Sequence, residues 1–265
     1  MTEAELENLD IVEERPRRVH FEWLLPLFFK PRRTLTKISE QNHAVWITPL
    51  LVLSLLAIVA VLAASPVRQL AAQMGSEIPP DFEWWSPEQQ QQFMEAQANS
   101  SGPMFTIVFP ALGAVLGLWV SWFLLGSILH LALTLAGSRG TNTAALNLTG
   151  WAMLPLGLRM IVQTVAVLVS KQLIAGQGLS GFIASDATGF MLYLRSMLGF
   201  VDIYFLWMVA LLLIGAAIIS GMQRGKTWVT VLVAVLILLA LQALPGFIGG
   251  QLGGLSGGGS GFYFF

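Results

Sequence analysis

The stretch VDIYFLWMVALLLIGAAII, residues 201–219, is uncharged except for one carboxylate, Asp202. A helix needs about 20 apolar residues to cross the hydrocarbon core of a bilayer. The stretch therefore predicts a membrane-spanning helix. What a carboxylate does at its start depends on the segments around it.

The composition of the 265-residue chain is that of an integral membrane protein. Hydrophobic residues make up 55% and charged residues 11% of it, whereas an average soluble domain has about 25% charged residues. The mean hydropathy is +0.70. The chain has no cysteine, which excludes disulfides, thiolate metal sites and cysteine nucleophiles. The net charge of -1 gives no indication of nucleic-acid binding.

Five apolar runs predict an all-α polytopic fold with five transmembrane helices: 47–64, 103–136, 151–173, 199–220 and 228–248. The second run would reach about 50 Å as a helix, which is more than one upright crossing needs. Two spans and a turn would need about 40 residues, and no turn signal lies in its middle. We therefore interpret it as one helix, tilted or bent near Pro110.

The distribution of Lys and Arg predicts the orientation. Ten of these residues lie on the side of the N-terminus and three on the opposite side. Because basic residues are enriched in cytoplasmic loops, we expect the N-terminus in the cytoplasm and the C-terminus outside. The chain then divides into a cytoplasmic N-terminal tail (1–45), a five-span membrane domain (46–250) and a glycine-rich outer tail (251–265).

The stretch FEWLLPLFFKPRRTLTKI, residues 21–38, is first apolar, then basic, and too short to cross the membrane. We expect it to lie in the cytoplasmic interface, with its aromatic side chains among the headgroups and its bases on anionic lipid or on a partner. Six residues are candidates for these contacts: Trp23, Phe28, Phe29, Lys30, Arg32 and Arg33.

Two segments outside the spans have a local pattern. The outer loop 65–102 is acidic, and within it Ser86, Pro87 and Glu88 have the order of an N-cap, a first helical residue and a first-turn acid. We expect a short surface helix there. The C-terminal tail combines many glycines with the aromatic end FYFF. It either has no fixed structure of its own or docks on a neighbour or on the bilayer.

The chain lacks the patterns of common enzyme sites. Its histidines are His20, His43 and His130, so no pair is spaced for a metalloprotease helix, and no phosphate-binding loop is present. An intramembrane aspartyl protease needs two facing carboxylates, and the predicted spans contain only Asp202. We expect a protein that is not an enzyme and that has no metal or cofactor.

The predicted spans contain four notable polar residues: His130, Arg159, Gln163 and Asp202. Charges within the bilayer are costly and usually mark a function or a partner. If Trp151 lies at the inner face and Gly199 at the outer face, Arg159 and Asp202 differ in depth by about 13 Å. We therefore expect no direct salt bridge. Instead, Arg159 should extend toward the nearer interface, and Asp202 should stabilise the first turn of the fourth span.

Small residues recur at four-residue spacing on the second span: Gly113, Gly117 and Ser121. Such a face lets helices pack closely, either within the chain or in a dimer. We expect it to close the five-helix bundle. Gln163 on the third span could hydrogen-bond to a neighbouring helix.

Three stretches resemble the Yip domain family (Ypt/Rab-interacting-protein type). They are LFFKPRRTLTKI before the first span, AGSRGTNTAALNLTGWAMLPLGL around the start of the third, and VDIYFLWMVALLLIGAAIISGMQRGKTW over the fourth. The likeness covers about residues 25–245 and implies five spans with a cytoplasmic N-terminus.

The resemblance also implies a non-enzymatic membrane protein that acts through partners. Eukaryotic relatives bind Rab-type GTPases, but their Asp-Leu-Tyr-Gly-Pro signature is absent here, which argues against GTPase binding. Bacterial members look more like accessory subunits beside ABC-type exporters. We therefore expect a scaffold or accessory subunit in a bacterial plasma membrane, acting beside such an exporter or in membrane trafficking or organisation. The alternative is a small secondary transporter or channel, which should have polar residues converging near the midplane or broken helices.

Overall fold

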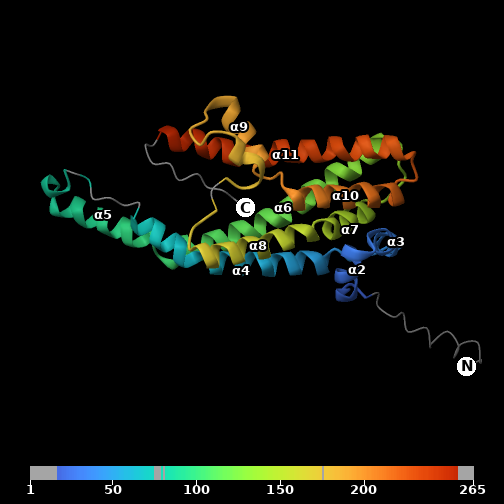
Figure 1. Cartoon of the computed structure of the whole chain (residues 1–265), viewed down its shortest axis with the longest axis horizontal. Helices are drawn as coiled ribbons and strands as arrows, with labels where there is room; N and C mark the ends of the chain where they lie inside the picture. Colours follow the sequence, from blue (N-terminus) through green and yellow to red (C-terminus); the bar gives the residue numbers. More distant parts are fainter. Residues whose placement is uncertain (1–16, 75–78, 80, 175, 256–265) are drawn as a thin grey trace, which may run out of the picture.

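The computed structural model describes residues 17–74, 79, 81–174 and 176–255. All regular structure within these residues is helical, which confirms the predicted all-α polytopic class (Figure 1). The tail segments 1–16 and 256–265 lie outside the described residues. The α-helices are α2 (Leu24–Phe29), α3 (Pro31–Ser39), α4 (Ile47–Met74), α5 (Pro87–Ser100), α6 (Phe109–Leu135), α7 (Asn142–Ala152), α8 (Leu154–Ser170), α9 (Gly189–Leu198), α10 (Ile203–Ile219) and α11 (Arg224–Leu255).

Four helical segments are long and apolar enough to cross a membrane: 47–73, 104–135, 142–170 and 224–251. A fifth span is possible where α9 and α10 join, because together they pass the same test with a bend of 69° between them. The segment 104–135 is a single helical span, as the length argument predicted, and a π-helical turn (Met104–Val108) precedes Pro110 at its start. Such turns commonly accommodate local disruption of a helix.

The helical segment that contains the third predicted span begins before that span. Its helix starts at Asn142 rather than at Trp151, and the side chain of Thr141 caps it by accepting the Ala144 N–H. The predicted spans left residues 137–150 between the second and third spans, but Asn147 in this stretch is fully buried and hydrogen-bonded. Its amide accepts the Val45 N–H and donates to the His43 carbonyl, both at 2.9 Å.

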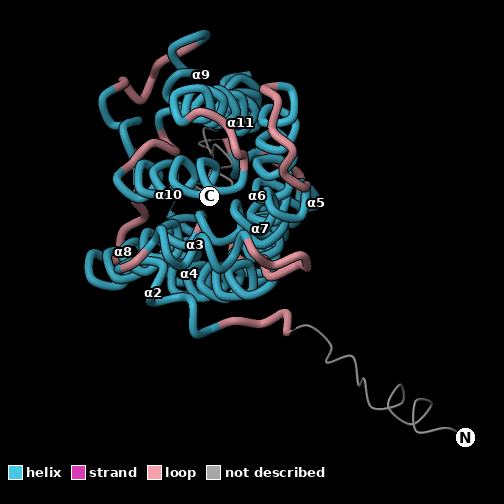
Figure 2. The backbone as a smooth tube through the Cα atoms, turned by 90° about the vertical axis from the view of Figure 1, so that its right-hand side faces the viewer, coloured by secondary structure: helices cyan, strands magenta, loops and turns pink. Residues whose placement is uncertain are grey.

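The helices pack side by side into a bundle (Figure 2), in which α7 is largely buried and contacts α3, α4, α6, α8 and α10. Helix α4 packs against α6 and α8, while α10 packs against α3, α7, α8 and α11. Two glycines permit the closest approaches to α7. A Cβ at Gly215 of α10 would overlap the Leu148 side chain, and one at Gly126 of α6 would lie 2.6 Å from Leu146 Cδ2.

The surface helix predicted within residues 65–102 is confirmed as α5. Ser86 caps it, and Gln89 completes a reciprocal capping box, in which each side chain bonds to the backbone of the other residue. Pro87 is its first residue and Glu88 lies in its first turn, as the sequence indicated.

Candidate functional site

A cluster of polar groups lies where α9 gives way to α10. We call it the polar break; it comprises residues 199–202 with Arg159 and Gln177. Arg159 Nε lies 3.1 Å from Asp202 Oδ2, and both side chains are largely buried, with exposed fractions of 12% and 18%. A terminal nitrogen of Arg159 donates to Gln177 Oε1 at 3.1 Å and to the Gly199 carbonyl at 3.4 Å. The guanidinium thus joins α8 to both sides of the helix break.

Asp202 also performs the structural role predicted for it. Its backbone is extended, and its Oδ1 accepts the Phe205 N–H at 2.8 Å, which makes it the N-cap of α10. An N-cap side chain satisfies one of the backbone donors that the first turn leaves free, and a carboxylate there also faces the positive end of the helix dipole. One carboxylate oxygen therefore starts the helix while the other binds Arg159.

The expectation that Arg159 and Asp202 do not pair was wrong. It assumed that Gly199 lies at the outer face, whereas helix α9 precedes Gly199 and joins α10 through a bend of 69°. Trp151 donates to the Val45 carbonyl and is thus level with the start of α4. Arg159 is eight residues further on, or about 12 Å along the helix, and the 3.1 Å contact places Asp202 at the same depth. The pair therefore lies about 12 Å beyond the level at which α4 starts.

The other predicted intramembrane polar residues are not part of this cluster. Gln163 is half-buried one turn beyond Arg159 on α8, and His130 is half-buried on α6. Gln177, which does take part, follows α8 in a connecting segment and had not been singled out, because a lone glutamine outside the spans carries no local signal.

The small-residue face of α6 is joined to α11 at one of its three positions. Gln242 of α11 donates to Ser121 Oγ at 2.8 Å. Gly113 and Gly117 are half-buried on the same helix. Packing of this face within the bundle stays a prediction for the two glycines.

The segment Phe21–Ser39, here called the basic segment, forms a 3-10 turn followed by α2 and α3. Two of its predicted surface aromatics in fact face the protein. Trp23 stacks on His20 at 3.8 Å and lies 5.6 Å from Trp151, and Phe28 packs edge-on against Trp207. Both side chains are half-buried against the helices, and contact of their exposed parts with headgroups stays a prediction.

A different apolar row of the basic segment is exposed. Phe21, Leu25 and Phe29 have exposed fractions of 57%, 71% and 80%. Their four-residue spacing places them on one face. Of the three, only Phe29 had been predicted as a surface contact. The candidate bases Lys30, Arg32 and Arg33 are exposed as expected.

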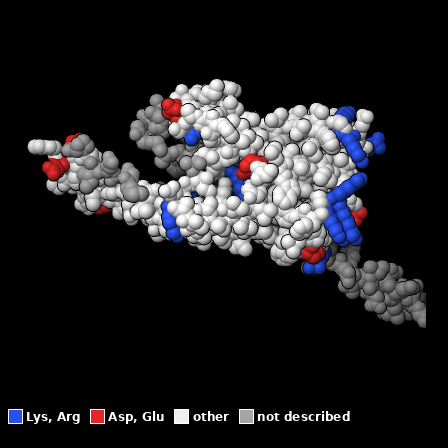
Figure 3. All heavy atoms as spheres, viewed as in Figure 1, with Lys and Arg blue, Asp and Glu red and all other residues white. Residues whose placement is uncertain are grey.

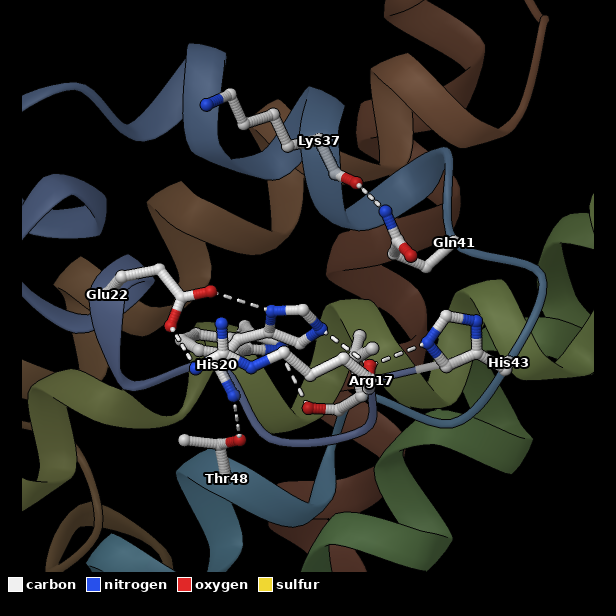
Figure 4. A network of polar contacts seen from close by, with 9 residues as sticks. Arg17, His20, Glu22, Lys37, Gln41, His43 and Thr48 are labelled. Carbon is white, nitrogen blue, oxygen red and sulfur yellow. Dashed lines mark hydrogen bonds and ion pairs between the residues drawn. The ribbon is translucent and has the colours of Figure 1, made fainter. Parts of the chain in front are cut away.

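A polar network fixes the start of the basic segment to α4 (Figure 4). The backbone N–H of buried His20 donates to Thr48 Oγ1 at 2.9 Å. The two ring nitrogens of His20 lie 2.9 Å from Glu22 Oε1 and 2.7 Å from the Arg17 carbonyl. The hydrogen bond from His20 lowers the pKa of Glu22, and its own backbone N–H and the Arg17 charge lower it further.

Lys and Arg side chains gather at one end of the molecule, at the end where α3 lies (Figure 3). This is also the end at which α10 passes into α11, whose first residues include Arg224 and Lys226. Among the described residues, no group of three His, Cys, Asp or Glu side chains is arranged to hold a metal ion.

A family model described as the Yip1 domain matches residues 26–244. The match runs from α2 through most of α11 and includes the polar break. No curated protein and no solved structure gives a match to the chain.

Proposed function

Since this chain belongs to the Yip1 domain family, we propose that it is a membrane scaffold or accessory subunit that acts through protein partners. The multi-pass helical architecture agrees with a membrane-associated, non-enzymatic role. The observation that carries the proposal is the polar break. Its charged groups bind one another, so they support the fold and are not left free for a substrate.

The basic segment is the surface that we propose for a partner. Lys30, Arg32 and Arg33 are exposed. They belong to α3 or cap it, and α3 lies at the basic end of the molecule (Figures 1 and 3). Bases at this level can attract both an anionic membrane surface and an acidic protein. The partner class that we propose is an ABC-type exporter subunit, in the plasma membrane of a bacterium. GTPase binding is not part of the proposal, because the signature of eukaryotic relatives is absent.

The orientation of the chain in the membrane is part of the same proposal. The ten-to-three distribution of Lys and Arg supports a cytoplasmic N-terminus and an external C-terminus. Because the chain has no cysteine, single cysteines at positions 2 and 260 can be labelled without background. An impermeant thiol reagent should reach position 260 only. Labelling of position 2, or protection of both, would contradict this orientation.

Crosslinking in native membranes, followed by purification of the chain, tests the partner surface. The charge-reversal variant Lys30→Glu, Arg32→Glu, Arg33→Glu should fold normally and yield less of the crosslinked complex. Reversal of Arg224 and Lys226, at the same end of the molecule, is the matched control and should have a smaller effect. Equal losses in the two variants would show that the bases act only through diffuse charge.

A second candidate is a small transporter or channel, and one observation favours it. A charged pair lies deep in the bundle at a broken helix, and broken helices with polar groups line the substrate sites of many transporters. A transporter of this kind needs Asp202 as a titrating or ion-binding group. In proteoliposomes, an ion flux that the purified chain supports and that Asp202→Asn abolishes would favour this function over the scaffold.

A further inference from the structure

A cavity of about 330 Å³ lies in the basic segment, between α2 and α3. Its volume is at the lower end of the range for small-ligand sites, about 300–1,000 Å³. Trp23 and Pro26 form its apolar wall, while Lys30, Arg33 and Lys37 form the basic one; Glu22 and Thr34 complete the lining. Three cations therefore surround one small space.

These cations are not neutralised within the described part of the chain. No carboxylate there lies within 4.0 Å of Lys30, Arg33 or Lys37. Glu22 is the one acid in the lining, but its two oxygens face His20 and Arg17. The cavity thus keeps a positive charge that a bound anion would balance.

The helix that carries the bases would be stabilised by such an anion. Arg33 and Lys37 are four residues apart on α3, a spacing at which like charges destabilise a helix. Lys30 is the N-cap of α3, and its side chain makes no capping bond. Cations at a helix N-terminus oppose the helix dipole, whereas an anion there is favoured.

The exposed apolar row indicates where the anion comes from. Phe21, Leu25 and Phe29 belong to the 3-10 turn and to α2, which also form one wall of the cavity. Large apolar side chains exposed beside a basic surface are typical of segments that insert into the membrane interface. With this row among the acyl chains, the cavity would lie at the level of the phosphates.

We propose that the cavity between α2 and α3 binds the phosphate headgroup of one anionic phospholipid, with Lys30, Arg33 and Lys37 as its ligands and Phe21, Leu25 and Phe29 beside the acyl chains. This goes beyond the partner role, and it is tested on the purified chain with no partner present. Failure of lipid binding would therefore leave the partner surface to be judged on its own.

Native mass spectrometry of the delipidated full-length protein in detergent provides the test. Dioleoyl phosphatidic acid and dioleoyl phosphatidylglycerol are titrated separately, with dioleoyl phosphatidylcholine as the zwitterionic comparison. We expect the first molecule of an anionic lipid to bind more tightly than the molecules that bind after it. Arg33→Gln and Lys37→Gln should each weaken that first binding event about fivefold.

Arg32→Gln is the matched control, because Arg32 is exposed on the same turn but is not part of the cavity lining. It should change the first binding event less than twofold, in keeping with a remote surface charge. Equal effects of Arg32→Gln and Arg33→Gln would overturn the site in favour of diffuse attraction. Equal binding of phosphatidylcholine would overturn it as well.

Competition with inorganic phosphate distinguishes a bound lipid from a bound soluble anion. Millimolar phosphate should not displace the bound lipid, because it lacks the acyl chains that the apolar row contacts. Displacement at that concentration would assign the cavity to free phosphate and refute the lipid proposal. Phe29→Ser should lower affinity for the lipid while leaving the protein folded, and unchanged affinity would contradict the role of the row.

Discussion

Removing the Asp202 carboxylate without removing the cap should destabilise the protein. Asn is as good an N-cap as Asp, so Asp202→Asn retains the bond to the Phe205 N–H and loses the charge that faces Arg159. Breaking a buried ion pair from one side costs about 3–5 kcal/mol, because the remaining charge is left without its counterion. Arg159 keeps the Gln177 and Gly199 oxygens as acceptors. We therefore expect Asp202→Asn to lower the free energy of unfolding by an amount near the lower limit, about 3 kcal/mol.

A double variant that removes both charges distinguishes the loss of the ion pair from a simple loss of packing. Arg159→Gln alone should also be costly, since it leaves Asp202 as the unpaired charge. Arg159→Gln combined with Asp202→Asn leaves neither charge unpaired. Its destabilisation should fall short of the sum of the single losses by about 2 kcal/mol, a coupling energy typical of residues in contact.

Reversible unfolding in mixed micelles of dodecyl maltoside and sodium dodecyl sulfate measures these free energies. Gln163→Met, one turn along α8 from Arg159, serves as the control for a polar substitution on the same helix. Additive losses in the double variant would refute the reasoning, because they would mean that the 3.1 Å contact contributes no coupling. Asp202→Ala should be about 1 kcal/mol worse than Asp202→Asn through loss of the cap.

Three further changes test the bundle and the basic segment. Gly215→Ala should lower the free energy of unfolding by about 1–3 kcal/mol through overpacking against α7, whereas Gly249→Ala, on α11 with open space around it, should not; equal effects would contradict the close approach. Asn147→Leu leaves two backbone groups before α4 unpaired and should cost about 2 kcal/mol or more in the same unfolding assay, so a neutral result would contradict the buried network. The pKa of Glu22 is lowered below its ordinary 4.5, chiefly by the hydrogen bond from His20. Its contribution to stability is therefore present above about pH 4.5 and is lost as the pH falls through the lowered value; Glu22→Gln should remove that part of the acid dependence, and an unchanged pH profile would refute it.

Local patterns were enough to predict two helix starts. Ser86 and Asp202 act on N–H groups within three residues of themselves, so the nearby sequence contains the whole interaction. The apolar spans could be predicted for the same reason, because length and hydropathy are local properties.

Features that depend on distant segments could not be predicted in this way. The partners of Asn147 lie more than 100 residues away, so the nearby sequence did not indicate that the helix starts before Trp151. The position of Asp202 depends on where α10 packs against α8, which the residues next to Asp202 do not indicate. In the basic segment, the residue types of Trp23 and Phe28 do not indicate whether these side chains face lipid or protein. The four-residue spacing of Phe21, Leu25 and Phe29, however, could have indicated the exposed face.

Our proposal assigns the polar break to support of the fold and the basic segment to contact with the partner. The neutral variant Arg159→Gln, Asp202→Asn tests it most directly, since it removes both deep charges and leaves the basic segment unchanged. The measurement is the amount of crosslinked complex recovered from native membranes, relative to the amount of folded chain. We expect the variant to yield the wild-type amount of complex. Loss of the complex from a variant that is still folded and inserted would contradict it, because the deep charges would then be required for the function itself.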